Sequence, residues 1–364
     1  MFRHILAIET SCDETSAAVM DGNKVLSNII SSQYFHKEYG GIVPELASRA
    51  HIQIIDKIVT SAITSSGVDK QKIEYASATA GPGLIGSLLV GYNYAKGFAL
   101  AGNIPFIPVN HIESHLFSCF IGRENVDFPF ISLVVSGGHT ILFHVNGINS
   151  YTILGETQDD AAGEAFDKAA KMLGLEYPGG PEIEKHAEGG DENFHKFPIA
   201  NIKDNMYDFS FSGIKTSLLY FLRKHYPEKN NLPLADICAS FQKAIVYSLV
   251  EKTILAAKNL GINTIAVSGG VSANTRLRTE FMKYNDPTPA YAEASAGRLA
   301  LPTASRLGGK GKGSNGFNIF FPEKKYSTDN AAMIGYLAYL KLKDSKMPLS
   351  NNDILADSFA RFKH

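Results

Sequence analysis

A strand, a polar turn and a second strand occur twice in this chain, and this repeat restricts the fold more than any other feature. The first unit covers residues 5–20, with a hydroxyl-rich and acidic turn at 11–15. The second covers 131–145, with Ser-Gly-Gly-His-Thr at 136–140. Each pattern predicts a β-hairpin. A single hairpin is common, but two copies of one design indicate two related domains.

Helical and strand patterns alternate in the rest of the chain. A helical stripe covers 42–63, and 75–109 has the pattern of a strand, a helix and a strand. Further helices are predicted at 161–173, from 182 onward, and at 212–226, 234–260 and 275–283, and further strands at 264–267 and 317–321. We therefore predict an α/β fold. Its first domain comprises 1–126 and is rejoined by 327–364, and its second comprises 127–326.

The composition is that of an ordinary soluble protein with two cores. The 364 residues are 45% apolar and 20% charged. Cys12, Cys119 and Cys238 are an odd, scattered set, which favours a reducing compartment over a disulfide framework. Neither a signal peptide nor a membrane span is expected, so we predict a cytoplasmic protein. The net charge of -1 does not indicate nucleic-acid binding, so a nucleic acid would have to meet a local basic patch or be shared with another subunit.

Two histidines at helical spacing predict a metal site. His111 and His115 are four residues apart, so on a helix they project from one face. Neutral imidazoles favour zinc, iron, nickel or copper over magnesium or calcium. Asp329 is the best third ligand, in the first turn of a helix that Ser327 or Thr328 would cap. Such a pair also occurs in helices that merely pack, so the spacing alone does not establish metal binding.

The residues around the pair fit peptidase chemistry poorly. The zincin pattern places a glutamate directly after the first histidine, and that position is Ile112. Glu113 is one residue further on, about 200° around the helix from His111. We expect it to face solvent or a neighbouring strand.

Glycine-rich turns predict a nucleotide site. The tetrapeptide Val-Ser-Gly-Gly ends predicted strands at 135–138 and again at 267–270. Only the second copy leads into a helix, at 275–283, whose free amides could hold a phosphate or a nucleoside. Between the copies, Pro-Gly-Gly-Pro at 178–181 forms a tight turn where a ligand can approach the backbone. Each turn alone is weak, but the three together indicate a nucleotide cleft.

These motifs occur in the order of one protein family. The motifs are Glu-Thr-Ser-Cys-Asp-Glu-Thr at 9–15, the histidine pair, 135–140, 178–181, Phe-Ser-Phe-Ser-Gly at 209–213, 268–274 and 328–330. The chain resembles the tRNA N6-adenosine threonylcarbamoyltransferases (TsaD), formerly described as O-sialoglycoprotein endopeptidases. The resemblance covers nearly everything except 286–315. Val134 stands where archaeal members have a metal-contacting tyrosine, so the chain resembles the bacterial or organellar branch.

The resemblance implies a fold and a set of site residues. The fold is that of actin, Hsp70 and sugar kinases, with two duplicated α/β domains and an interdomain cleft. One divalent metal is implied at His111, His115 and Asp329, with Fe²⁺ favoured and Zn²⁺ as the alternative. Asp13 and Glu14 match acidic residues near the transfer site. The implied substrate-binding residues are Val134, Val135, Ser136, Gly137, Gly138, Asp167, Gly180, Glu184 and Asn274.

The implied reaction moves a threonylcarbamoyl group from threonylcarbamoyl-AMP to N6 of adenosine 37 in tRNA, releasing AMP. The implied partners are a paralogous TsaB-type subunit and a TsaE-type ATPase, and a homodimer is compatible with the sequence. Three other functions remain. A kinase of this fold would require magnesium and carboxylates. A metallopeptidase would require the missing glutamate, and a non-catalytic scaffold would not require the intact motifs.

Residues 286–315 interrupt the regular pattern. This segment contains three prolines and ends in a Gly-Lys-Gly-Lys-Gly run, which predicts a flexible insertion. A connection of about 30 residues is far longer than the usual 2–6. We expect a surface excursion that catalysis does not need. The alternative is contact with tRNA phosphates through Arg298, Arg306, Lys310 and Lys312.

Overall fold

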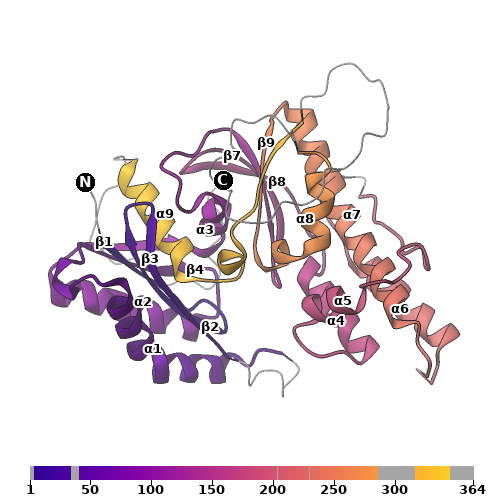
Figure 1. Ribbon diagram of the computed structural model, residues 1–364, viewed down its shortest axis with the longest axis horizontal. Helices are drawn as coiled ribbons and strands as arrows, with labels where there is room; N and C mark the ends of the chain where they lie inside the picture. The colour runs from indigo at the N-terminus through magenta and orange to yellow at the C-terminus, as the bar shows by residue number, and fades with distance from the viewer. Residues whose placement is uncertain (1–3, 34–40, 203, 229, 286–315, 345–364) are drawn as a thin grey trace.

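The computed structural model describes residues 4–33, 41–202, 204–228, 230–285 and 316–344. The predicted insertion lies outside them. Within the described residues the chain forms two five-stranded sheets with flanking helices (Figure 1). The prediction of an α/β fold with two domains is therefore confirmed.

The first sheet has the strand order β3-β2-β1-β4-β5. Its antiparallel part pairs β1 with β2 and β2 with β3, and its parallel part pairs β1 with β4 and β4 with β5. The strands are β1 (His4–Glu9), β2 (Glu14–Asp21), β3 (Lys24–Ser32), β4 (Tyr75–Gly81) and β5 (Phe106–Asn110). The carboxyl ends of β1, β4 and β5 consequently meet at one edge.

The second sheet repeats this topology in the order β10-β9-β6-β7-β8. Strands β6, β7 and β8 are antiparallel neighbours, and β6, β9 and β10 are parallel. Their bounds are β6 (Phe130–Val135), β7 (Thr140–Gly147), β8 (Ser150–Glu156), β9 (Thr264–Ser268) and β10 (Asn318–Phe320). The repeated hairpin thus reflects a duplicated domain. The third strands, β3 and β8, were not predicted, because both are partly exposed edges that mix polar and apolar residues.

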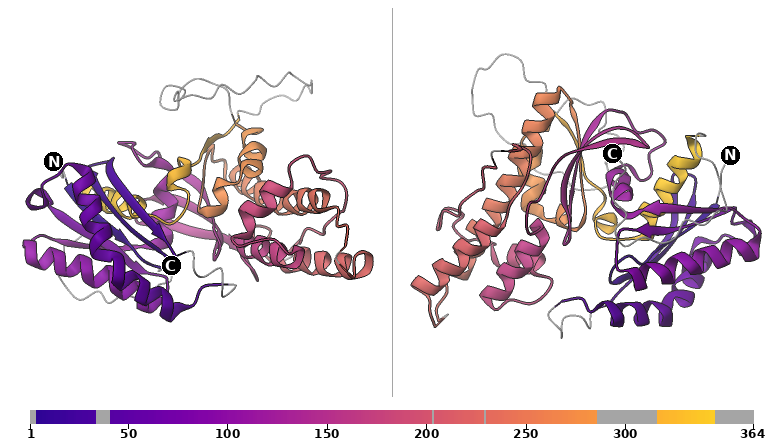
Figure 2. Two further views of the ribbon diagram at one scale, coloured as in Figure 1. Left: turned by 60° about the horizontal axis from the view of Figure 1, so that its bottom comes forward. Right: turned by 180° about the vertical axis from the view of Figure 1, so that it is seen from behind.

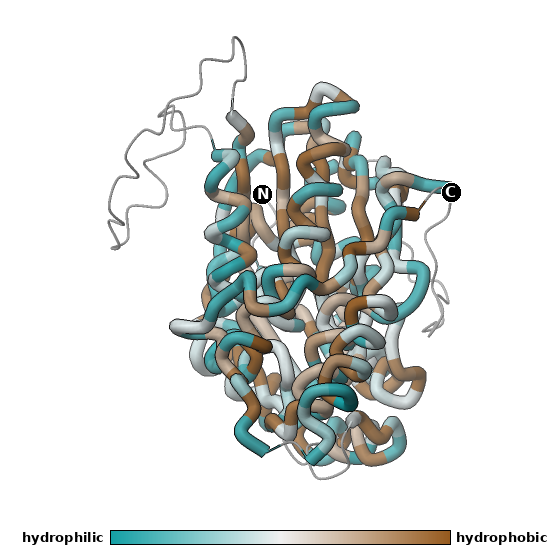
Figure 3. The backbone as a smooth tube through the Cα atoms, turned by 90° about the vertical axis from the view of Figure 1, so that its right-hand side faces the viewer, coloured by the Kyte–Doolittle hydropathy of each residue, from teal (hydrophilic) through white to brown (hydrophobic). Residues whose placement is uncertain are grey.

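The helices form three groups around the sheets (Figures 1 and 2). Helices α1 (Pro44–Ser66) and α2 (Ile85–Gly102) cover the outer face of the first sheet. Helices α4 (Ala162–Leu173), α5 (Gly179–His186), α6 (Ser212–His225), α7 (Leu234–Leu260) and α8 (Thr275–Met282) lie on the outer side of the second domain. Brown and teal alternate along many helical segments in Figure 3, as expected for helices with one apolar face. Short 3-10 helices occur at Lys70–Lys72, Ser118–Phe120, Gly270–Ala273 and Lys324–Tyr326.

Helices α3 (His111–Phe117) and α9 (Ala331–Lys343) lie between the two domains. They belong to one apolar core that also contains Ile5 of β1 and Phe130 of β6. In β1, alternate residues face opposite sides of the sheet, so Ile5 packs toward α9 while Leu6 packs toward α1 and α2. A single core therefore joins both sheets through these two helices.

Helix α9 begins two residues later than a cap at Thr328 would place it, and three later than a cap at Ser327. Asn330 is its N-cap, and the Asn330 side chain accepts a hydrogen bond from the amide of Met333 at 3.2 Å. The expectation that Ser327 or Thr328 caps this helix is wrong, because the side-chain oxygen of Asn330 accepts the capping hydrogen bond in their place. Asp329 consequently stands just before the helix, with its carboxylate free of capping bonds.

The opposite face of α3 also differs from the prediction. Glu113 is buried and forms an ion pair with Lys341 of α9 at 2.6 Å. The solvent alternative is therefore wrong, because α9 packs directly against this side of α3. The strand alternative is supported, since burial and then the charge of Glu113 raise the pKa of Tyr151 on the neighbouring strand β8. The two helices that carry the candidate metal ligands are thereby joined by a buried charge pair.

Candidate functional site

The candidate metal site forms where β1 and β5 end. Asn110 closes β5 and caps α3, accepting a hydrogen bond from the amide of Glu113 at 3.0 Å. His111 is therefore the first residue of a helix that starts directly at the strand end. Both His111 and His115 are buried. This is the edge where open α/β sheets place their ligands.

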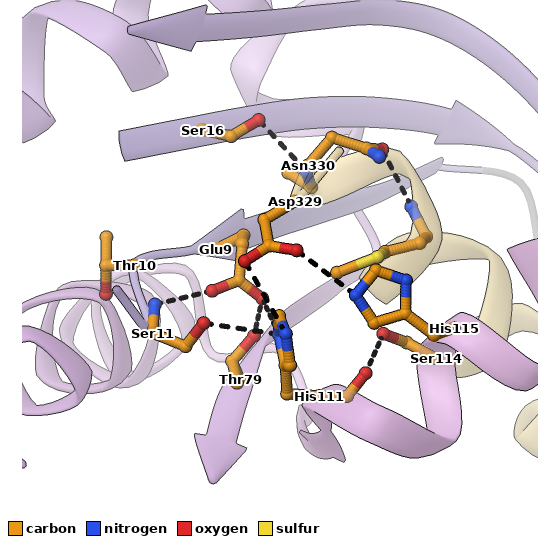
Figure 4. A network of polar contacts seen from close by, with 12 residues as sticks. Glu9, Thr10, Ser11, Ser16, Thr79, His111, Ser114, His115, Asp329 and Asn330 are labelled. Atoms are coloured by element: carbon orange, nitrogen blue, oxygen red, sulfur yellow. Dashed lines mark hydrogen bonds and ion pairs between the residues drawn. The ribbon is translucent and has the colours of Figure 1, made fainter. Parts of the chain in front are cut away.

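Asp329 meets both histidines across this edge (Figure 4). Its Oδ1 lies 3.1 Å from Nε2 of His115, and its Oδ2 lies 3.6 Å from Nε2 of His111. One ligand atom from each residue lies within 4.8 Å of the others. Ligands held at about 2.1 Å around a tetrahedral ion stand about 3.4 Å apart, so these spacings fit one metal ion. The Asp329 side chain is 23% exposed, which leaves one side of the group accessible.

Glu9 lies directly behind His111 and was not assigned a role from the sequence. Its Oε2 lies 3.0 Å from Nδ1 of His111, and Thr79 and the amide of Ser11 donate to the same carboxylate. A carboxylate on Nδ1 leaves Nε2 of His111 directed at Asp329. Burial lowers the pKa of His111, but the carboxylates of Asp329 and Glu9 outweigh it and raise that pKa to about 9. Glu9 ends β1, so the strand-end rule could have identified it.

Asp13 lies in the turn from β1 to β2 and Glu14 is the first residue of β2, and both are near Asp329. Burial raises the pKa of Glu14, and the charges of Asp329 and Asp13 raise it further. His51 of α1 contacts this turn, and its Nε2 lies 2.9 Å from the Cys12 carbonyl oxygen. The structure thus brings both predicted acidic residues toward the metal ligands.

The loop after β6 approaches the same place from the second domain. It is a tight turn in which the amide of Ser136 donates to the carbonyl of His139 at 2.8 Å. Burial and the nearby His111 and His115 lower the pKa of His139 to about 4. The carbonyl of the same Ser136 accepts a hydrogen bond from the amide of Gly163 in α4 at 3.1 Å. This loop therefore connects the metal ligands with the start of α4.

The predicted substrate-binding residues of this loop divide into two kinds. Gly137 and Gly138 are exposed, and Ser136 is half-buried. Val134 and Val135 are fully buried in the apolar cores on opposite faces of the sheet. The side chains of the two valines are therefore not accessible to a ligand.

A second group of predicted substrate-binding residues lies on α4, α5 and α8. Asp167 accepts a hydrogen bond from the amide of Gly179 at 2.7 Å, beside Gly180. Glu184 accepts from the Asn274 side chain at 3.2 Å and from the amide of Thr275 at 2.7 Å. The structure brings Asp167 to the first turn of α5, which contains Gly180 and takes the place of the tight turn predicted at 178–181, and it brings Glu184 to Asn274.

The start of α8 is not free to bind a phosphate. Asn274 caps it by accepting from the amide of Leu277 at 2.9 Å, while Glu184 occupies the amide of Thr275. These two occupied amides argue against a phosphate at this helix start, whereas the nucleoside alternative stays a prediction. The two Val-Ser-Gly-Gly copies do lie side by side, since Val134 of β6 pairs with Ser268 of β9. Gly269 has φ 87°, and a Cβ there would collide with the Val135 carbonyl.

Tyr177 lies near both the acidic turn of the first domain and the substrate-binding residues predicted on α4 and α5. It precedes α5 in the second domain, and charged residues of both domains shift the pKa of its phenol. Burial raises its pKa, and the charges of Asp167 and Asp13 add to this effect. Asp13 belongs to the first domain, so the acidic turn faces the second domain at this point.

The fold defines a class of proteins. HypF from T. kodakarensis matches with a TM-score of 0.59 over 94% of this chain and 48% of that chain, at 13% identity. A 2-hydroxyglutaryl-CoA dehydratase component A from Acidaminococcus fermentans matches with a TM-score of 0.51 over 94% and 99%, also at 13% identity. The duplicated sheets and these likenesses place the chain in the fold class of actin, Hsp70 and sugar kinases. Among the described helices, none has the length and apolarity needed to span a membrane.

Sequence comparison identifies the family within this class. The chain belongs to the tRNA N6-adenosine threonylcarbamoyltransferases (TsaD), whose family profile matches residues 24–336. A relative of that name from Prosthecochloris aestuarii is 47% identical over 99% of both chains. Another from Chloroherpeton thalassium is 49% identical over 93% of this chain and 92% of its own. The resemblance noted in the sequence is thereby confirmed.

Proposed function

We propose that this protein transfers the threonylcarbamoyl group from threonylcarbamoyl-AMP to N6 of adenosine 37 in tRNA and releases AMP. Family membership over nearly the whole chain is the observation that carries this proposal. The proposed place of action is the cytoplasm. The proposed partners are a TsaB-type subunit and a TsaE-type ATPase, which would add tRNA-binding surface to that of a chain whose net charge is only -1.

One divalent metal ion, Fe²⁺ or Zn²⁺, is the proposed cofactor. His111, His115 and Asp329 would hold it, since two imidazoles and a carboxylate are a donor set that these ions prefer. When bound, the metal supplies Lewis-acid polarisation of the acyl donor. The same donor set disfavours the rival kinase, whose magnesium prefers oxygen ligands.

The chain's own residues would position the reactants, accept the proton of the amine and stabilise the departing AMP. The exocyclic amine of adenosine is a weak nucleophile because its lone pair is delocalised into the ring, so positioning contributes much of the rate. Asp13 and Glu14 are the proposed acceptors of the N6 proton. Main-chain amides of the exposed Gly137 and Gly138 would stabilise the departing AMP, with Asp167, Gly180, Glu184 and Asn274 holding its nucleoside.

Glu9→Gln tests how His111 is oriented. We expect the metal affinity to fall about 10- to 100-fold, because a neutral amide supports Nδ1 of His111 less well than a carboxylate. A competition titration with a chromophoric chelator measures the affinity. Glu45→Gln, at an exposed position of α1, is the control. Wild-type affinity in Glu9→Gln would show that His111 needs no orienting carboxylate.

Reconstitution tests the reaction itself. Purified protein, its two proposed partners, threonylcarbamoyl-AMP and unmodified tRNA are mixed, and the nucleosides are analysed by mass spectrometry after digestion. We expect threonylcarbamoyladenosine at position 37 and one AMP per transfer. Unmodified adenosine 37 together with phosphorylation of a sugar substrate would replace the proposal by the kinase function.

A further inference from the structure

An open groove on the outer side of the second domain is not used by the proposed site. It has a volume of about 650 Å³ and follows α6 from Ser212 and Gly213 at its start to Lys224 and His225 at its end. The opposite face of this helix is buried through Leu218 and its neighbours, so the groove face is the one left without a partner. Figure 1 shows α6 on the side of the second domain that is remote from the first sheet.

Aromatic side chains give this groove flat apolar surfaces. Tyr220 projects from the middle of α6 and is 63% exposed. Beside it, the ring of Phe221 lies 4.4 Å from that of His195 and 5.0 Å from that of His225, measured between centroids. Proteins that bind unpaired nucleotides stack bases on such rings.

Lys224 is the charged residue of the groove lining. Lys224 and two histidines, His195 and His225, contribute to the lining, and neither aspartate nor glutamate is among the lining residues. Burial and the neighbouring His225 lower the pKa of His195, so the positive charge of the lining is that of Lys224, which can pair with one phosphate. An apolar peptide would use the rings but not the lysine, so the combination favours RNA over a protein segment.

The start of the groove is tied to the loop of the proposed site. The amides of Phe211 and Ser212 donate to Asp159 at 2.8 and 3.2 Å, and Lys215 of α6 forms an ion pair with Asp160. Asp160 lies two residues before α4, whose first turn contains Gly163, the partner of the Ser136 carbonyl. The Phe-Ser-Phe-Ser-Gly motif thus fixes α6 relative to the site.

We propose that this groove binds a nucleotide of the tRNA other than the modified adenosine. Its base would stack on Tyr220 and the Phe221 cluster, and its phosphate would pair with Lys224. This inference rests on the proposed function for the identity of the RNA. It adds a second contact, which would hold the tRNA body while adenosine 37 enters the site.

Two substitutions in the full-length protein, with its partners present, test the groove. Tyr220→Ala is expected to raise the Kd for tRNA about tenfold, as loss of one stacked base does. Lys224→Gln is expected to reduce the slope of log Kd against log salt by about 1. Fluorescence anisotropy with labelled unmodified tRNA measures both. Tyr247→Ala and Lys258→Gln are matched controls, because both residues are exposed on α7 and Lys258 also lies in a last helical turn.

Binding and transfer separate this inference from the proposed function. A raised Kd in Tyr220→Ala alongside wild-type protein that binds tRNA without modifying it would support the groove and contradict the function. Transfer by wild type with an unchanged tRNA Kd in both groove variants would overturn the groove alone. Loss of a partner subunit from the variants, with tRNA affinity unchanged, would also overturn it and identify a protein as the occupant.

Discussion

Asp329→Ala is expected to remove the metal ion and to lower the rate of threonylcarbamoyl transfer about a hundred- to a thousandfold. The Asp329 carboxylate lies 3.1 Å and 3.6 Å from the two histidine nitrogens, so its loss opens the ligand set. Loss of metal polarisation is worth several kcal/mol, and each 1.36 kcal/mol is a factor of ten in rate. Folding should be retained, because Asn330 rather than Asp329 caps α9.

Elemental analysis of the purified variants measures the metal content, and the reconstituted reaction measures the rate. His111→Ala should behave in the same way, with at least a tenfold lower metal affinity. His144→Ala is a suitable control, since this histidine lies on β7 outside the candidate ligand group. Full metal occupancy in both His111→Ala and Asp329→Ala would remove the site from consideration.

Lys341→Met is expected to destabilise the protein by about 3–5 kcal/mol at pH 8. The Lys341 ammonium lies 2.6 Å from the Glu113 carboxylate, and both residues are buried, at 9% and 4% exposure. Removing the cation leaves an unpaired carboxylate between α3 and α9. Urea unfolding followed by circular dichroism measures the free energy of unfolding. Lys343→Met, at an exposed position of the same helix, should be nearly neutral by comparison.

The pH dependence of this effect has a definite sign. Burial raises the pKa of Glu113 above 4.5 and Lys341 opposes that rise, so the substitution raises the pKa further. A carboxyl whose pKa is higher in the folded than in the unfolded state costs stability once the pH exceeds the unfolded value. The deficit of Lys341→Met should therefore grow from pH 5 to pH 8. Glu113→Gln combined with Lys341→Met should recover much of the loss, whereas an equal deficit at every pH would contradict this explanation.

Periodicity predicted most of the elements, because helices such as α7 and strands such as β9 follow the apolar pattern closely. It missed β3 and β8, since the pairing of an edge strand is set by its neighbour rather than by its own pattern. Residues 286–315, expected as an insertion, lie outside the described residues.

The candidate ligands were predictable from residue type and spacing. The structure adds that Asp329 lies beside the two histidines, although it is more than 200 residues away from them in the sequence. The contacts that support them were less accessible to sequence reasoning. Glu9 and Lys341 act through tertiary contacts to α3, and neither contact has a local signature in the sequence. The occupied amides of α8 depend similarly on Glu184, which lies 91 residues away from Thr275.

The core shared by α3, α9 and both sheets limits how the two domains can move. Ile5 and Phe130 belong to different sheets, yet they share this core with Leu337 of α9. Separating the sheets would expose that apolar surface to water at a cost of roughly 25 cal/mol per Å². A small rotation of the domains about α3 and α9 therefore costs less free energy than a movement that separates the two sheets. Because His111 begins α3 and Asp329 lies two residues before α9, such a rotation would displace the candidate metal ligands least and the outer loops most.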